Sequence, residues 1–281
     1  MLSILTSMIK PKILQVETTN DCNSNCKICM RTHWKRGVGY MSYEDFTKLP
    51  ISEFDEVALH GWGECFLHPD LFKMVKYIKQ QNVKASLCTN GKLLGERLDE
   101  VLESGLDEIA FGIFTLDGKE EILKNIEALL EERKKRGVPI TTFFDITVFK
   151  ENLEEIKDIV EKAIELGVDG IVFHRLFDIY NVDNDVKYGL TPKEEKTFFN
   201  QIKEKYGKQI PLYFPLKHTT PCRVLLKCMF VRYDGLQSPC VYLSDDTLGD
   251  ARNSTYKEML KRHILFIKGV KNNVICKQCI W

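Results

Sequence analysis

The sequence predicts an α/β fold in which helices cover the outside of a parallel β-sheet. Short apolar stretches alternate with stretches of helical periodicity along most of the chain. Glycines follow four of the expected helices, where a left-handed residue commonly ends a helix. Polar residues recur on one face of several strands. Together these patterns are typical of repeated βα units.

Six strands and five helices are expected. The expected strands lie at 11–18, 55–62, 83–89, 107–114, 140–148 and 168–176. The expected helices lie at 69–81, 95–104, 119–136, 152–166 and 191–206. The last helix has a clear start, because Thr191 is its N-cap, Pro192 takes its first position and Glu194 completes a capping box. Successive βα units imply a parallel sheet, either open or closed into a barrel.

The strands carry polar side chains on the face that the helices leave uncovered. By the two-residue period of a strand, this face includes Glu17, His60, Glu64, Asp145 and His174. A closed eight-stranded barrel fills its interior mainly with Val, Ile and Leu. The polar interior therefore favours a wider, incomplete barrel that holds a ligand.

The composition excludes several classes of function. The chain has 281 residues, enough for one large domain or a domain with an appendage. Lys plus Arg equals Asp plus Glu at 40 each, so no strong field attracts nucleic acid or an anionic membrane. No apolar run approaches the roughly 20 residues that cross a bilayer, and the N-terminus does not resemble a signal peptide. A cytoplasmic location is expected.

Ten cysteines are many for such a chain, and eight of them fall into two groups. Disulfides are disfavoured in a reducing compartment, where clustered cysteines are typical of metal ligands. Cys65 and Cys88 stand alone and are expected to be inert packing residues.

The first group follows the first strand with the spacing C-x₃-C-x₂-C and consists of Cys22, Cys26 and Cys29. Structural zinc usually has four ligands, and only His33 lies nearby as a fourth. A cubane iron–sulfur cluster is held by thiolates, and three ligands leave one iron open for a small molecule. The spacing favours an iron–sulfur cluster and leaves a zinc knuckle as the alternative.

At these residues the sequence resembles the radical SAM superfamily. The stretch "CNSNCKIC" matches its C-x₃-C-x-Φ-C loop, with Ile28 as the apolar Φ. The resemblance extends over about 11–176 and implies a partial (β/α)₆ barrel. It also implies that the open iron of a 4Fe-4S cluster chelates S-adenosylmethionine (SAM). Cleavage of SAM then yields a 5′-deoxyadenosyl radical that removes a hydrogen atom from the substrate.

Two further segments resemble SAM-binding motifs of that family. "HGWGEC", 60–65, resembles G-G-E-P, although Trp62 and Cys65 depart from the pattern. "CTNG", 88–91, resembles T-N-G at the end of the third strand. An ordinary strand-end carboxylate and a common Asn-Gly turn are the alternative interpretations. The residues that the resemblance implies as SAM contacts are Gly61, Gly63, Glu64 and Asn90.

The second group of cysteines resembles the SPASM and twitch extensions of radical SAM enzymes. It combines C-x₁₂-G-x₄-C, from Cys222 through Gly235 to Cys240, with C-x₂-C at Cys276 and Cys279. The resemblance implies that these four cysteines hold an auxiliary 4Fe-4S cluster, and a zinc site is the competing interpretation. Cys228 is left over and is expected to be a buried hydrophobic residue, with replacement of Cys222 as a ligand as the alternative.

Two domains are expected. Residues 1–207 would form the radical SAM partial barrel core, and residues 208–281 a twitch/SPASM-like auxiliary cluster domain with a β-hairpin and a helix.

Three functions remain open. A fully ligated auxiliary cluster can accept an electron, which favours net oxidation of a small alcohol or sugar-like molecule, with a ferredoxin or flavodoxin as reducing partner. Such a reaction needs a base near the substrate carbon. The second hypothesis is a peptide or protein maturase that forms a crosslink or thioether, and the third is a zinc-stabilised binding protein without catalysis. The candidates for the base are Glu17, Asp145, His174 and Asp178.

Overall fold

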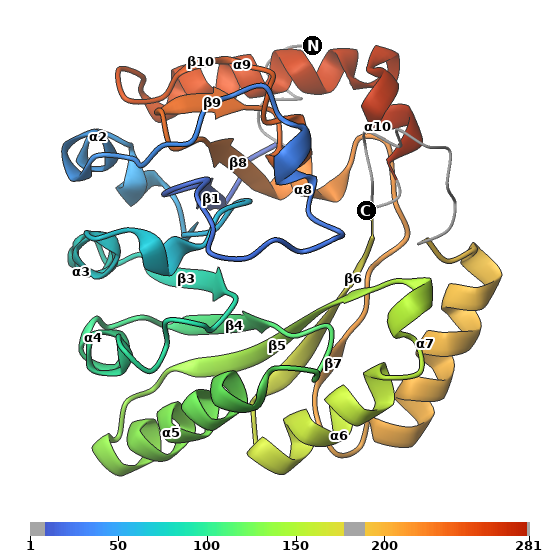
Figure 1. Ribbon diagram of the computed structural model, residues 1–281. Coiled ribbons are helices and arrows are strands. Elements are labelled where there is room, and N and C mark those ends of the chain that lie inside the picture. The colour runs from blue at the N-terminus through green and yellow to red at the C-terminus, as the bar shows by residue number, and fades with distance from the viewer. Residues whose placement is uncertain (1–8, 177–188, 280–281) are drawn as a thin grey trace. The chain divides into compact units, whose positions relative to one another are not determined.

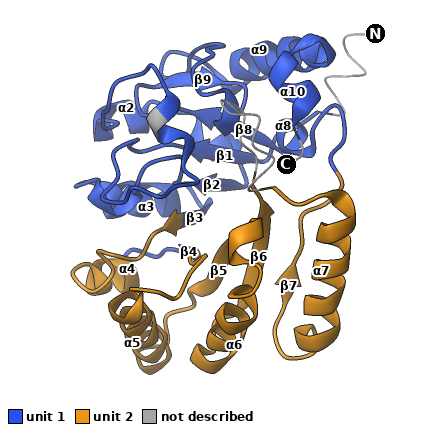
Figure 2. Ribbon diagram, turned by 45° about the vertical axis from the view of Figure 1, so that its right-hand side comes forward, with its two compact units in different colours: residues 1–87, 104–106, 218–279 blue, residues 88–103, 107–217, 280–281 orange. Residues whose placement is uncertain are grey.

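The computed structural model describes residues 9–176 and 189–279, which group into two compact units (Figures 1 and 2). Unit 1 contains the described residues of 1–87, 104–106 and 218–279, and unit 2 those of 88–103 and 107–217. Both units contain parallel strands and helices, and unit 1 also contains an antiparallel hairpin. The predicted α/β class is therefore confirmed.

Strand β1 is the centre of the sheet in unit 1. It pairs in parallel with β2 on one side and with β8 on the other, and the hairpin of β8 and β9 continues the sheet to β10. Leu14 and Val16 of β1 are fully buried, in line with their outward-facing position in the strand pattern. The strands are β1 (Ile13–Val16), β2 (Glu56–Ala58), β3 (Lys84–Thr89), β8 (Cys228–Val231), β9 (Leu236–Ser238) and β10 (Gly249–Asp250).

The helices of unit 1 are mostly short. In α3, Leu71, Met74, Val75 and Ile78 recur at helical spacing and are fully buried. The longest, α9, starts at a capping box formed by Thr255 and Glu258. The α-helices are α2 (Tyr43–Thr47), α3 (Leu71–Gln80), α8 (Arg223–Lys227), α9 (Tyr256–Gly269) and α10 (Val274–Gln278). The 3₁₀ turns are η1 (Met30–His33), η2 (Ile51–Glu53), η3 (Cys65–Leu67), η5 (Val241–Leu243) and η6 (Val270–Asn272).

Unit 2 is a parallel sheet in the order β4, β5, β6, β7. Residues of β5 alternate between buried and half-buried, so one face meets the helices and the other does not. Gly137 and Gly167 end α5 and α6 at φ 67° and 77°, as their positions predict. The strands are β4 (Glu108–Gly112), β5 (Thr141–Val148), β6 (Gly170–Arg175) and β7 (Leu212–Tyr213). The helices are α4 (Leu98–Glu103), α5 (Glu120–Arg136), η4 (Lys150–Asn152), α6 (Ile156–Leu166) and α7 (Pro192–Tyr206).

Strands β8 and β9 form a hairpin in the C-terminal segment, where a β-hairpin was expected, whereas β7 and β10 were not expected from the sequence. All six expected strands and five expected helices are present within a few residues of their predicted ends. The βα pattern does not stop near residue 208, because α8 leads into β8, which pairs with β1. This pairing places 218–279 in the same unit as 9–87. The predicted domains, 1–207 and 208–281, stay a prediction.

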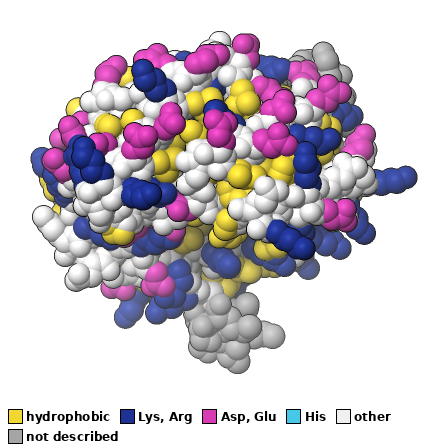
Figure 3. All heavy atoms as spheres, turned by 90° about the horizontal axis from the view of Figure 1, so that it is seen from below, with side chains coloured by type: hydrophobic (Ala, Val, Ile, Leu, Met, Phe, Trp, Pro, Cys, Tyr) yellow, Lys and Arg dark blue, Asp and Glu magenta, His cyan; other side chains and the backbone are white. Residues whose placement is uncertain are grey.

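Charges of both signs mix on the surface. On the face drawn in Figure 3, Lys and Arg side chains are interspersed with Asp and Glu, as expected from equal numbers of each. No helix within the described ranges is long and apolar enough to cross a membrane.

Candidate active site

The loop that carries the first three cysteines begins directly after β1. Its start is fixed by hydrogen bonds to residues 37–39. The Thr19 hydroxyl donates to the Gly39 carbonyl at 2.8 Å, and the Asn20 amide bonds both the Gly37 carbonyl and the Gly39 N–H at 2.9 Å. The Cys29 N–H donates to the Cys26 carbonyl at 3.0 Å, which closes a turn. The loop is thus held at both ends by specific polar contacts.

The three thiols of this loop influence one another electrostatically. Burial raises the pKa of Cys22, and the neighbouring charges of Glu64 and Cys26 raise it further. Burial also raises the pKa of Cys29, where Arg31 opposes the rise and Cys22 adds to it. A thiol binds a metal as the thiolate, so burial of this kind favours the neutral thiol until a cation or metal offsets it. The electrostatic effects indicate that the thiols lie near one another.

Unpaired donors follow the third cysteine. Arg31 Nε, Trp34 Nε1 and Arg36 Nε are buried and have no hydrogen-bond acceptor in the part of the chain that the structure describes. A buried donor without an acceptor costs about 1–3 kcal/mol. Of these three side chains, Arg31 lies near enough to the Cys29 thiol to lower its pKa, so its N–H group is suited to the sulfur atoms of an anionic metal–sulfur group, which accept hydrogen bonds.

The segment 60–65 packs against the backbone that leads into this loop. A Cβ atom on Gly63 would lie 2.2 Å from the Thr19 carbonyl oxygen and 2.7 Å from that of Asp21. The Glu64 N–H donates to the Asp21 carbonyl at 2.7 Å. Only glycine permits this approach of two backbones. Gly63 therefore has a packing role beside its expected contact with SAM.

Glu64 is buried at the start of η3. Its Oε1 accepts from the Phe66 N–H at 3.0 Å, an N-cap contact. The Cys65 thiol lies 3.9 Å from the same oxygen and is itself buried, as expected of a packing cysteine. The predicted contact between Glu64 and SAM stays a prediction.

Glu17, one of the candidate bases, forms a buried ion pair with Arg36. Arg36 Nη2 lies 2.7 Å from Glu17 Oε1, and Nη1 bonds the second oxygen. The Glu17 side chain is 0% exposed and that of Arg36 6%. A Cβ on Gly61 would lie 2.7 Å from the Glu17 side chain, so this glycine makes room for the pair. The bidentate pairing favours a structural role for Glu17 over that of a base.

His174 and Asp145 come together on the uncovered face of the sheet in unit 2. His174 Nε2 lies 3.2 Å from Asp145 Oδ2. Burial alone would lower the pKa of His174, but the Asp145 carboxylate outweighs it and the pKa of His174 is raised. The Cys88 thiol lies 3.8 Å from the same carboxylate oxygen. Cys88 thus contacts a candidate base, and its expected role as an inert packing residue stays a prediction.

Two predicted site residues are left: Asn90, a predicted SAM contact, and Asp178, the last candidate base. Asn90 Oδ1 accepts from the Lys92 N–H at 3.0 Å, and Gly91 has φ 76°. This geometry agrees with the Asn-Gly turn interpretation, and the SAM contact of Asn90 stays a prediction. Asp178 lies outside the residues that the structure describes.

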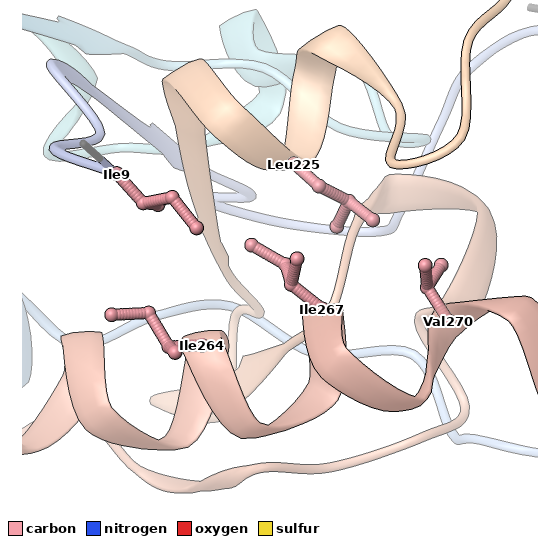
Figure 4. Packing of buried hydrophobic residues seen from close by; sticks show 5 residues of the cluster. All are labelled: Ile9, Leu225, Ile264, Ile267 and Val270. Carbon is pink, nitrogen blue, oxygen red and sulfur yellow. The ribbon is translucent and has the colours of Figure 1, made fainter. Parts of the chain in front are cut away.

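The four C-terminal cysteines assigned to one site are neighbours in unit 1. Burial raises the pKa of Cys240, and the charges of Cys276 and Cys279 add to it. Burial also raises the pKa of Cys276 to about 11, with contributions from Cys279 and Cys222. Three of the four pack beside the apolar cluster drawn in Figure 4, whose members are Ile9, Leu225, Ile264, Ile267 and Val270.

Cys228 lies apart from these four. Its thiol is 3.9 Å from Gln15 Oε1 and 3.4 Å from the Met229 carbonyl. Burial raises the pKa of Cys228 to about 12. Within the described ranges, no three His, Cys, Asp or Glu side chains are drawn together as tightly as one metal ion requires. The grouping of the cysteines therefore rests on their spacing and on their mutual electrostatic effects.

Comparison with known proteins identifies the family. The family model described as "Radical SAM superfamily" matches residues 16–163. The chain belongs to the radical SAM superfamily. Membership implies a 4Fe-4S cluster and SAM, and the three thiols with their unpaired N–H neighbours fit such a cluster.

Several curated relatives of this radical SAM protein differ in function. The tungsten-containing aldehyde ferredoxin oxidoreductase cofactor-modifying protein of Pyrococcus furiosus is 27% identical, over 82% of this chain and 70% of its own length. The probable GTP 3′,8-cyclase of Methanococcus vannielii is 27% identical, over 92% of this chain and 93% of its own length. The antilisterial bacteriocin subtilosin biosynthesis protein AlbA of Bacillus subtilis is 22% identical, over 86% of this chain and 58% of its own length.

A solved structure shares the fold. Streptococcus suis SuiB, crystallised with the precursor peptide SuiA, superimposes with a TM-score of 0.76 at 14% identity. The match covers 98% of this chain and 71% of SuiB. The fold shared with SuiB therefore includes the C-terminal segment.

Sequence reasoning missed Arg36, Cys88 and the contacts of Trp62. Arg36 lies in a loop without periodicity, so no pattern indicates its pairing with Glu17. The inward position of Asp145 was apparent, but the approach of Cys88 depends on the register between strands. The departure of Trp62 from the family motif was the one available signal.

Replacing Glu17 with Gln should destabilise the protein by about 3–5 kcal/mol, because it leaves the Arg36 charge buried without its partner. Urea denaturation measures the change in free energy of unfolding. The control is Glu44→Gln, in an exposed pair with Lys48, which should cost less than about 1 kcal/mol. Adding Arg36→Leu to Glu17→Gln should recover part of the loss. Equal effects of the two single variants would contradict the buried pair.

Replacing Asp145 with Asn should lower the pKa of His174, measured by an NMR titration of its ring protons. The pKa of His174 is raised in the folded state. The pair of His174 and Asp145 therefore contributes most to the free energy of unfolding at pH values below the unfolded-state pKa of about 6.5. This contribution is lost as the pH rises through the folded-state pKa of His174. The stability difference between wild type and variant should therefore be larger near pH 6 than near pH 9. Asp158→Asn on α6 is the control, and an unchanged His174 titration in Asp145→Asn would disprove the coupling.

Proposed function

We propose that this radical SAM enzyme catalyses the net oxidation of a small alcohol or sugar-like molecule. The observation that carries the proposal is the presence of two cysteine groups in unit 1, three in one and four in the other. Three ligands leave an iron open for SAM, and four ligands close a second cluster that serves electron transfer.

Some of the proposed site residues bind the clusters and SAM, and others transfer a proton. Cys22, Cys26 and Cys29 hold the first cluster. When bound, this cluster and SAM supply a 5′-deoxyadenosyl radical that takes a hydrogen atom from the substrate, and an auxiliary cluster supplies an acceptor for one electron. Gly61, Gly63, Glu64 and Asn90 bind SAM, and Cys222, Cys240, Cys276 and Cys279 hold the auxiliary cluster.

The proton of the substrate hydroxyl goes to the pair of His174 and Asp145. Loss of a hydrogen atom, a proton and an electron converts an alcohol to a carbonyl compound, so one base is required. The Asp145 carboxylate, 3.2 Å away, stabilises the imidazolium that forms when His174 takes the proton. A ferredoxin or flavodoxin supplies the electron that starts the reaction.

The second candidate is a peptide or protein maturase. It is favoured by the relatives, since AlbA is named for subtilosin biosynthesis and SuiB was crystallised with a precursor peptide. The two candidates use the same first cluster and differ in the molecule that loses the hydrogen atom.

The radical function is tested by release of 5′-deoxyadenosine from SAM after anaerobic reconstitution and reduction with dithionite. Replacing Cys22, Cys26 or Cys29 with Ala should reduce release to the background of SAM without protein, because the cluster loses a ligand. Cys65→Ala is the matched control and should keep release near the wild-type rate. Deuterium transfer into 5′-deoxyadenosine from deuterated polyols supports the oxidation, and transfer from peptides alone supports the maturase. Persistent release in the three variants would refute the assignment.

The auxiliary cluster is tested by iron and sulfide content. Wild-type protein should hold about eight irons and Cys276→Ala about four, because a four-cysteine cluster loses a ligand. Cys228→Ala should keep about eight irons, since Cys228 lies among Gln15 and Met229 instead. A wild-type content near four irons, or a loss of iron in Cys228→Ala alone, would contradict this ligand set.

A further inference from the structure

Trp62 joins two segments of unit 1 that are far apart in the sequence. Its indole Nε1 donates to the Val241 carbonyl at 2.9 Å, across 179 positions of the chain. Its ring packs edge-on against Tyr242, with centroids 5.5 Å apart and planes at 72°. Val241 directly follows Cys240, a predicted ligand of the auxiliary cluster. The side chain of Trp62 therefore reaches the C-terminal cysteine segment.

The other side of Trp62 meets the segment that follows the first three cysteines. The Trp34 and Trp62 rings pack edge-on at 5.3 Å and 72°. The Arg36 guanidinium lies 4.2 Å from the centroid of Trp34, a distance typical of a cation–π contact. The ion pair of Arg36 with Glu17 continues this series of contacts to the end of β1.

Trp62 also lies within the turn expected to bind SAM. Its neighbour Gly63 is pressed against the backbone of Thr19 and Asp21, and the Trp62 N–H approaches Glu17 Oε1 at 3.5 Å. Residues 61–64 are therefore held from one side by the strand end before Cys22. They are held from the other side by residues 241–242.

We propose that Trp62 is a positioning residue for SAM, through which the segment that follows Cys240 sets the affinity for SAM. This inference rests on the proposed function, in which Gly61, Gly63 and Glu64 bind SAM. The indole anchors the turn to the η5 segment, so the backbone groups of the turn keep one orientation. A turn released from this anchor must be ordered when SAM binds, and that ordering weakens binding.

The test measures the dissociation constant of SAM by equilibrium dialysis on the anaerobically reconstituted protein without reductant, so that SAM is not cleaved during the measurement. Three single variants separate the contacts. Trp62→Phe keeps an aromatic ring but loses the donor to Val241. Trp62→Gly restores the family residue and loses the hydrogen bond to Val241 and the ring contacts with Tyr242 and Trp34. Tyr242→Leu removes one of the two partner rings. The matched control is Tyr43→Leu, which removes a similar edge-on pair with Tyr77, with centroids at 6.1 Å.

Trp62→Gly should raise the dissociation constant about tenfold, since an aromatic contact and a hydrogen bond are lost. Tyr242→Leu should raise the dissociation constant by a few fold. The dissociation constant of Trp62→Phe should lie between those of the wild type and Trp62→Gly. The double variant of Trp62→Gly and Tyr242→Leu should bind no more weakly than Trp62→Gly alone, because the two act through one contact. Iron content and melting temperature should match those of Tyr43→Leu, which should bind SAM as wild type does.

Two failures are distinguishable. If the wild-type protein carries its first cluster and does not bind SAM, the proposed function itself is refuted. If the wild type binds SAM and the Trp62 and Tyr242 variants bind it equally well, the positioning role is refuted while the function stands. The positioning role would also be refuted if the two substitutions weakened SAM binding additively in the double variant. It would likewise be refuted if SAM binding weakened only in variants that had lost iron.

Discussion

The buried ion pair between Glu17 and Arg36 organises the region around the first three cysteines. Glu17 directly follows β1 and Arg36 follows the cysteine loop, so the pair closes the segment that contains all three thiols. A buried ion pair costs much of its Coulombic energy in desolvation, and its contribution lies more in defining one arrangement than in net stability. The close contact of Gly61 and the stacking of Arg36 on Trp34 both depend on where this pair lies.

Elements governed by local chemistry were predictable from the sequence. The capping box of Thr191 and Glu194 and the left-handed glycines at 137 and 167 mark helix ends through contacts within a few residues. Strand β8 was expected only as part of a C-terminal β-hairpin, and its place beside β1 was not predictable from the sequence. Its assignment depends on pairing with β1, whose partner residues are more than 200 positions away.

In the candidate site, too, local features were predictable from the sequence and contacts between distant segments were not. The spacing of the three N-terminal cysteines is local and identified the family before any geometry was known. Strand alternation placed Asp145 and His174 on one face, and the structure brings them within 3.2 Å. Alternation states which face a residue takes but not which residue of another segment it meets. The pairing of Glu17, the approach of Cys88 to Asp145 and the contact of Trp62 with Val241 required the folded chain.

The pairing of β1 with β8 also governs the order in which the protein is assembled during synthesis. Val16 pairs with Val231, and at the usual rate of translation roughly 10–40 s separate the synthesis of the two strands. During this interval β1 has an open edge, which is a site of unwanted pairing with other chains. The strand that leads into the cysteine loop is therefore paired on both edges only on a nearly complete chain.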